Sequence, residues 1–236
     1  MSSIVLNADR DEKFLEEHGD LIENVESCDV VCICGDFLPL KIQRDSQKSL
    51  KWLKNDFLPW CQSLECNYVL IVSGNHDFIF DEKLHKNSTW DKLCELFNNF
   101  DKVKWIDNKD IIIDNIKFYG CPYTIGPTGW ANYCPDQLHP YEDIPKDTDI
   151  LLVHQPPIGM VGTVNQLDAI NYMTCYGSFS MMNKLLMPEC NIKYLFCGHI
   201  HTGLHSEELI GNTKCYNVSL KDENYKLSFP YKVLEI

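Results

Sequence analysis

The sequence predicts an α/β protein, a four-layer α/β/β/α sandwich in which two packed mixed β-sheets lie between flanking helices. Short apolar runs alternate with helical segments along the first half of the chain, and the second half ends in strands. Such β-α-β units followed by strands favour two packed sheets with helices outside. No linker, repeat or low-complexity tract interrupts the sequence, so we expect residues 1–236 to form a single domain.

The first half is expected to hold three strands and three helices. Continuous apolar runs indicate buried strands, whereas apolar residues three or four positions apart indicate helices. The strands are expected at residues 3–8, 29–34 and 68–73, and the helices at residues 11–25, 45–64 and 91–99. We expect an interruption of the second helix near Pro59 and a cap on the third at Thr89 or Asp91.

The second half is expected to be rich in strands, with one more helix. Turn-forming pairs mark two hairpins, at Asp114-Asn115 and Gly211-Asn212. The expected helix is residues 178–187, and the expected strands are residues 103–106, 110–113, 116–119, 149–153, 193–197, 204–210, 213–219 and 227–236. We expect the last three of these strands to be antiparallel.

Charge and composition exclude several classes of function. The net charge is −13, and Arg10 and Arg44 are the only arginines. A surface this acidic repels a phosphate backbone, so we expect no long nucleic acid as a partner. No apolar run approaches the roughly 18 residues of a membrane span, and the first residues do not form a signal peptide. We therefore expect a cytoplasmic protein without membrane association, whose twelve cysteines are reduced thiols acting as small hydrophobes.

Five polar segments stand at or just past the ends of expected strands, where ligands gather in α/β sheets. Together they offer carboxylates, an amide oxygen and imidazoles, a mixture that suits Mn²⁺, Fe²⁺ or Zn²⁺ and suffices for two ions. Each segment alone has an ordinary explanation, such as a turn, a helix cap or a core histidine. The segments are Ala8-Asp9-Arg10-Asp11, Gly35-Asp36, Gly74-Asn75-His76-Asp77, Val153-His154 and Gly198-His199-Ile200-His201.

In this order the segments resemble the signature of calcineurin-like metallophosphoesterases, which reads Asp-x-His, Gly-Asp, Gly-Asn-His-Asp/Glu, His, Gly-His-x-His. The chain is further similar to the metallophosphoesterase-domain, UPF0046-like cyclic nucleotide phosphodiesterases. Residues 149–159 resemble their Thr-His-Gly-Pro-Pro-Leu-Gly segment, and residues 217–219 their Asn-Ala-Ser. Residues 118–123, with Gly129-Trp130 after them, resemble their Tyr-Gly-Ala-Pro-Trp and Gly-Trp pieces. The resemblance spans nearly the whole chain, from residue 3 to the end.

The resemblance implies a single calcineurin-like metallophosphoesterase domain that binds two divalent metal ions. Mn²⁺ is the expected metal, with Fe²⁺, Zn²⁺ and Mg²⁺ as alternatives. Asp36 would bridge the ions, and Asp9 and His201 would complete the first site. The metal ligands that the resemblance implies are Asp9, Asp11, Asp36, Asn75, His154, His199 and His201.

Asp11 departs from the family pattern, because the family has a histidine at this position. Its carboxylate could bind the first metal directly or through a water molecule. Alternatively, Asp11 begins the following helix, where a carboxylate suits the positive end of the helix dipole. The sequence supports both interpretations equally.

The function implied by the resemblance is hydrolysis of cyclic nucleotides or similar small phosphodiesters, by in-line attack of a hydroxide that two metal ions share. His76 would protonate the leaving oxygen or stabilise the phosphoryl charge without binding metal. The partner is then a small phosphorylated substrate, in particular a nucleotide, and the protein a monomer or homodimer. Tyr123, Trp130 and Tyr133 would stack a nucleobase or only anchor a surface loop. The alternatives are a phosphomonoesterase or nuclease using the same site, and a catalytically weak scaffold protein of the same fold.

Overall fold

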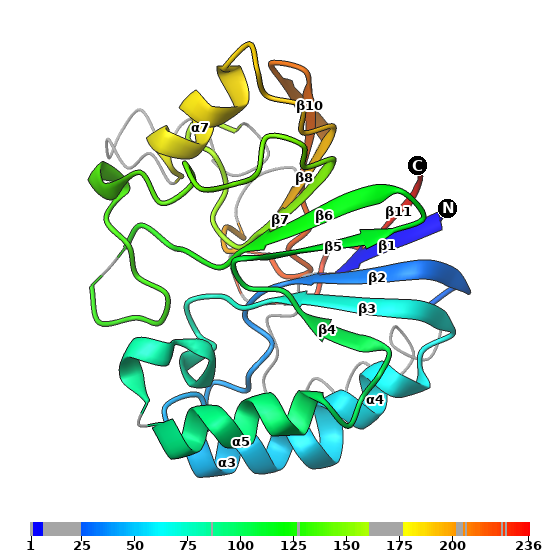
Figure 1. The fold of residues 1–236 in the computed structure, drawn as a ribbon, viewed down its shortest axis with the longest axis vertical. Helices are drawn as coiled ribbons and strands as arrows, with labels where there is room; N and C mark the ends of the chain where they lie inside the picture. The colour runs from blue at the N-terminus through cyan, green and yellow to red at the C-terminus, as the bar shows by residue number, and fades with distance from the viewer. Residues whose placement is uncertain are drawn as a thin grey trace.

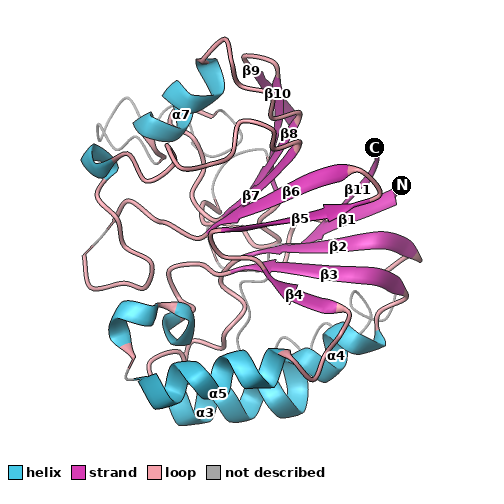
Figure 2. Cartoon of the chain, in the orientation of Figure 1, coloured by secondary structure: helices cyan, strands magenta, loops and turns pink. Residues whose placement is uncertain are grey.

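The protein has two β-sheets packed face to face, with helices on the outer side of each sheet (Figures 1 and 2). The computed structural model describes residues 2–6, 25–85, 87–126, 128–160, 177–201, 205, 207–222, 224 and 226–236. Within these residues, no helix is both long and apolar enough to cross a membrane.

The first sheet has the strand order β11-β1-β2-β3-β4. Strands β1 to β4 are parallel, and β11 pairs with β1 in the antiparallel direction. The strands are β1 (Ser2–Leu6), β2 (Cys28–Cys34), β3 (Cys66–Val72), β4 (Val103–Trp105) and β11 (Lys232–Glu235).

The second sheet has the strand order β5-β6-β7-β8-β10-β9. Its four central strands are parallel, and both edge strands are antiparallel to their neighbours. Asp114 and Asn115 form the β5–β6 turn with φ angles of 48° and 64°, as this hairpin type requires. The strands are β5 (Lys109–Ile113), β6 (Ile116–Cys121), β7 (Ile150–Val153), β8 (Tyr194–Cys197), β9 (Glu207–Ile210) and β10 (Thr213–Asn217).

Helices α3, α4 and α5 cover the outer face of the first sheet, and α7 lies beside the second (Figure 2). The side chain of Ser178 caps α7 by accepting the Met181 N–H. The helices are α3 (Ser46–Trp52), α4 (Leu58–Ser63), α5 (Asn87–Phe97) and α7 (Phe179–Leu186).

Alternating side chains on the central strands make the core. In β2, Val31 packs against the helices, and the next residue, Cys32, faces the second sheet. In β7, Leu152 faces the first sheet, whereas Leu151 packs toward α7. Both strands are therefore buried on two faces, which explains why their sequences are continuous apolar runs. The predicted fold class, a mixed α/β sandwich of two sheets with flanking helices, is confirmed.

Several element boundaries differ from the prediction. The break expected near Pro59 is a short π-helical segment, Leu53–Phe57, where the Leu58 N–H bonds the Leu53 carbonyl. Pro59 has no N–H to donate, and the helix widens just before it. Helix α5 begins at Asn87, so Thr89 and Asp91 lie inside the helix and do not cap it.

The last three strands were expected to be antiparallel, and this is confirmed for the β9–β10 pair, but β11 does not join them. Strand β10 is antiparallel to β9 but parallel to β8. Strand β11 joins the other sheet and is shorter than expected. A strand pattern in sequence carries no information about the partner strand, which is set by how the two sheets pack. The expected helix at residues 11–25 lies almost entirely outside the described residues.

Candidate metal centre

The site lies beyond the carboxyl ends of parallel strands from both sheets. Asp36 follows β2, Asn75 follows β3, His154 follows β7 and His199 follows β8. Strands β2 and β3 are neighbours in the first sheet, and β7 and β8 are neighbours in the second. Their carboxyl ends therefore converge where the two sheets pack together.

Four polar side-chain atoms meet at this point. His154 Nε2 lies 3.0 Å from Asp36 Oδ2 and 3.0 Å from Asn75 Oδ1. His199 Nδ1 lies 2.9 Å from Asn75 Oδ1 and 3.2 Å from His154 Nε2. The potential ligand atoms of Asp36, His154 and His199 all lie within 4.8 Å of one another. The structure therefore brings together four of the seven predicted metal ligands.

The hydrogen bond of His154 to the backbone leaves its Nε2 facing the cluster. Its Nδ1–H donates to the Cys34 carbonyl at 2.9 Å, so the neutral ring directs the Nε2 lone pair at the cluster. The atoms around Nε2 are the Asn75 amide oxygen, the Asp36 carboxylate and a second imidazole nitrogen. When His154 Nε2 and His199 Nδ1 carry no proton, these acceptor atoms repel one another unless a metal cation lies among them. Carboxylate, amide and imidazole ligands suit Mn²⁺, Fe²⁺ and Zn²⁺.

Burial disfavours the charged form of every titratable group here. Burial and the nearby positive charge of His154 lower the pKa of His199 to about 3, so this ring is neutral at pH 7. Burial also acts on Asp36, but the attraction of His154 holds its pKa below the usual range. In His154, Asp36 outweighs burial and raises the pKa to about 9. A cation at the cluster would replace the His154 proton.

Tight backbone turns deliver two of these side chains. Asp36 and His199 have φ angles of 56° and 69°, in the left-handed region that few residues other than glycine adopt. A Cβ on Gly35 would overlap the His154 ring, and a Cβ on Gly74 would overlap the Asp36 carboxylate. The glycines in both segments therefore let the ligands approach one another closely.

Asp77 ties the ligand segments after β2 and β3 together, a role that the sequence did not reveal. Its buried carboxylate accepts three backbone N–H groups, from Asp36 at 2.7 Å, Gly74 at 2.8 Å and Leu38 at 2.9 Å. Burial, together with the nearby charge of Asp36, raises the pKa of Asp77 to about 7. The residue positions the turns after β2 and β3 relative to each other.

His76 lies beside the cluster, and its ring is held by groups that are not ligands. Its backbone N–H donates to Asp36 Oδ1 at 2.8 Å, and its Nδ1 lies 2.7 Å from Gln43 Oε1. An amide oxygen only accepts, so Nδ1 carries the proton of this bond. The Trp130 ring packs edge-on against His76, with 4.5 Å between ring centroids. Gln43 was not expected from the sequence.

The loop that carries Trp130 rests on the segment before His76. The Ala131 N–H donates to the Asn75 carbonyl at 3.1 Å. The buried Asn132 donates through Nδ2 to Ser73 Oγ at 2.9 Å and to the Gly74 carbonyl at 3.0 Å. Asn132, also missed by sequence reasoning, therefore holds the loop against the site.

The three predicted aromatic residues do not act together. Trp130 contacts His76, and the Arg44 guanidinium lies 5.4 Å from the Trp130 ring centroid. Tyr123 instead accepts a hydrogen bond at its hydroxyl from Asn108 Nδ2, at 3.2 Å. Tyr133 pairs with Thr124 through an isolated backbone bridge.

The other predicted ligands were expected to form the first metal site. His201 is half-buried, and its carbonyl lies 3.2 Å from His205 Nε2. Asp9 and Asp11 lie outside the described residues. The two interpretations of Asp11 therefore both remain predictions.

The sequence is similar to proteins of one family. A family model described as calcineurin-like phosphoesterase matches residues 7–203. Metallophosphoesterase domain-containing protein 1 of Homo sapiens is 23% identical over 228 residues, which cover 88% of this chain and 64% of that protein. A UPF0046 protein of Caenorhabditis elegans is 27% identical over 238 residues, covering 89% of this chain and 55% of that protein. The chain thus spans less than two thirds of the length of either relative.

Solved structures share the fold. The protein TT1561 of Thermus thermophilus superposes with a TM-score of 0.60 at 13% identity, over 94% of this chain and 89% of that one. Phosphopantetheinyl hydrolase (PptH) from Mycobacterium tuberculosis has a TM-score of 0.54 at 11% identity, over 95% and 90% of the two chains. The resemblance expected from the motifs is confirmed by the family match.

Proposed function

Because the chain belongs to the calcineurin-like phosphoesterase family, we propose that it hydrolyses small phosphodiesters of nucleotide size, including cyclic nucleotides. The expected enzyme class, a metal-dependent phosphoesterase, is confirmed at the level of the family. The observation that carries the proposal is the convergence of Asp36, Asn75, His154 and His199, with His76 beside them but outside the cluster.

Two divalent ions, Mn²⁺ for preference, would be held by these residues. Asp36 would bind both ions, and Asn75, His154 and His199 would complete one site. Asp9 and His201, with or without Asp11, would complete the other. Bound ions of this kind polarise phosphoryl oxygens and lower the pKa of water, and that is the chemistry they supply.

His76 is the residue that we assign to the leaving group. Gln43 accepts from Nδ1, so the ring orientation is fixed and Nε2 is the nitrogen that can hold a transferable proton. From Nε2 the proton would pass to the oxygen that departs from phosphorus. Trp130 limits the movement of the ring and shields one side of it from water.

The preference for a phosphodiester rests on the similarity to the UPF0046 proteins and on Trp130. Its partly exposed ring next to His76 would contact the organic group attached to the leaving oxygen. A phosphomonoesterase or nuclease using the same site is the second candidate, and the net charge of −13 weighs against long nucleic acid. We further propose that residues 1–236 act as one domain in the cytoplasm, as a monomer or homodimer.

A substrate panel tests the proposal directly. Cyclic nucleotides, linear dinucleotides and phosphomonoesters would be compared with Mn²⁺, Fe²⁺, Zn²⁺ and Mg²⁺, each against the Asp36→Asn variant. We expect the highest kcat/KM for a small phosphodiester with Mn²⁺. A clear preference for phosphomonoesters would reject the proposed substrate class, and no turnover with any metal would favour the scaffold alternative.

A further inference from the structure

The amino ends of β2 and β3, at the opposite end of these strands from the metal centre, carry two cysteines. Cys28 opens β2, Cys66 opens β3, and the two are direct partners in the parallel register. Neighbouring strands lie about 4.7–4.9 Å apart. A disulfide spans a Cα separation of about 4.4–6.8 Å. Strand pairing therefore already holds the two residues at a separation that a disulfide can bridge.

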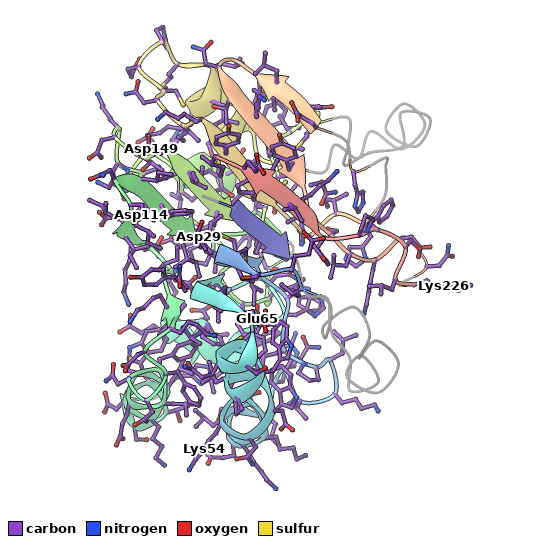
Figure 3. The ribbon with its side chains drawn as sticks, turned by 90° about the vertical axis from the view of Figure 1, so that its right-hand side faces the viewer. Asp29, Lys54, Glu65, Asp114, Asp149 and Lys226 are labelled. Atoms are coloured by element: carbon purple, nitrogen blue, oxygen red, sulfur yellow. The ribbon has the colours of Figure 1, made fainter. Side chains whose placement is uncertain are left out.

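Cys28 and Cys66 are more exposed than the other two cysteines on these strands. Cys28 and Cys66 are half-buried, whereas Cys32 and Cys34 are fully buried. The two half-buried cysteines line a surface hollow of about 310 Å³. Figure 3 faces this end of the sheet and labels Asp29 and Glu65, which flank the cysteines at the near ends of β2 and β3. The hollow brings solvent to the strand ends that carry the two cysteines.

The surroundings favour the reactive thiolate of Cys66. A hydrogen bond from the Cys28 thiol lowers the pKa of Cys66, burial opposes this effect, and the charge of Lys102 adds to the lowering. Lys102 is fixed there because its Nζ donates to the Leu64 carbonyl at 2.6 Å. At Cys34, by contrast, burial is the largest influence, and it raises the pKa well above the ordinary value. Thiolates, not thiols, react with peroxides.

We propose that Cys28 and Cys66 form a thiol-oxidation site, which hydrogen peroxide converts into a disulfide between β2 and β3. The Cys66 thiolate attacks one peroxide oxygen and the O–O bond breaks. Cys66 becomes a sulfenic acid, and the released hydroxide takes up a proton and leaves as water. The Cys28 thiol then attacks the Cys66 sulfur, the S–O bond breaks, and a second water leaves with the Cys28 proton. The two thiols lose two electrons in all, and one peroxide gains them.

The disulfide would change stability rather than catalysis. Strands β2 and β3 are seven residues long, so about 20 Å separates their amino ends from the ligand segments. A cross-link at this distance constrains the unfolded chain and leaves the carboxyl ends of the strands where they are. We expect oxidation to raise Tm by about 5–10 °C and to leave metal binding unchanged.

Peptide mapping of the full chain tests this inference without any activity measurement. The reduced, metal-free protein would be treated with hydrogen peroxide in rising amounts, quenched, and digested under non-reducing conditions. We expect a peptide pair joined through Cys28 and Cys66, lighter by two hydrogen atoms, before the exposed Cys94 is modified. A disulfide to a different cysteine, or prior oxidation of Cys94, would overturn the inference.

Variants identify the order of the steps. Cys28→Ser should stop the reaction at the Cys66 sulfenic acid, which dimedone traps. Cys66→Ser should prevent both the sulfenic acid and the disulfide from forming at low peroxide. Lys102→Met should slow disulfide formation, and Cys94→Ser is the matched control that should leave it unchanged. A disulfide that forms equally fast in the urea-unfolded wild type would show that the fold does not assist it, and this result stands even if a variant fails to fold.

Discussion

The cluster of predicted metal ligands and the groups that support it are adjacent in the fold, yet their hydrogen bonds differ in kind. In the cluster, Asn75 Oδ1, His154 Nε2 and His199 Nδ1 lie about 3 Å apart, and which ring nitrogen donates depends on where the imidazole protons are. In the support, Asp77 accepts three backbone N–H groups, and Asn132 donates to two oxygens. Backbone and side-chain groups of the fold satisfy the support, whereas the cluster offers atoms that suit a metal ion. A variant in the cluster should therefore damage function, and a variant in the support should damage stability first.

The largest effect is expected for Asp36→Asn, which removes the carboxylate from the centre of the cluster. Loss of its charge weakens the hold on both ions, so turnover should fall to the background rate and the metal content should drop. Metal analysis and kcat/KM measure these changes. Asp147→Asn is the matched control, because this exposed carboxylate pairs with Lys117 on the surface. Wild-type metal content and rate in Asp36→Asn would contradict the assignment.

His76→Ala separates a residue beside the cluster from a residue inside it. We expect kcat to fall by about 10²–10⁴-fold for poor leaving groups, with metal content unchanged. Substrates with good leaving groups need no proton and should lose much less. Gln43→Leu should also lower kcat most for poor leaving groups, but by a smaller factor. This variant only removes the hydrogen bond that orients the His76 ring. Equal losses across the leaving-group series would argue against proton transfer by His76.

Asp77→Asn probes the support. The substitution replaces one carboxylate oxygen by an NH₂ group, which cannot accept a hydrogen bond from the backbone. We therefore expect the free energy of unfolding to fall by about 1–3 kcal/mol. Turnover should fall about 10–100-fold through misplacement of the ligand turns. Urea denaturation measures the first effect. Asp45→Asn serves as control, because asparagine caps a helix as well as aspartate does.

The smallest effect concerns pH and Asp107, which accepts hydrogen bonds from the Ser73 backbone and hydroxyl. Burial raises the pKa of Asp107 from 3.8 to about 6. Between these pH values the folded state binds more protons than the unfolded state, so stability should fall as pH rises from about 4 to about 6 and then level off. Urea denaturation across this range should show a shallower slope for Asp107→Asn. An identical slope in the variant would mean that Asp107 is ionised throughout.

The proximity of four predicted ligands could be expected from the sequence because strand ends are local features. Asp36, Asn75, His154 and His199 each follow a continuous apolar run, and parallel strands bring such ends together. Asp77 stood in one of the same segments, but nothing in the sequence indicates which backbone groups its carboxylate accepts.

The support residues were harder to predict because they come from loops without periodic patterns. Gln43 and Asn132 reach the site only through the path of the folded backbone. The aromatic residues illustrate the same limit, since Trp130 and Tyr123 are close in sequence but contact different parts of the protein. Sheet membership was equally hidden for β11, whose sequence pattern does not distinguish one sheet from the other.

The pairing of β11 with β1 has a consequence for how the chain folds during synthesis. The ribosome makes β1 long before β11, yet the two strands lie side by side in the folded protein (Figure 1). Until β11 arrives, one edge of β1 has unpaired backbone groups, which invite pairing with other chains. This long-range contact also slows closure of the first sheet. A nascent chain that stalls before residue 232 would thus leave this edge of β1 unpaired, because β11 is the strand that covers it.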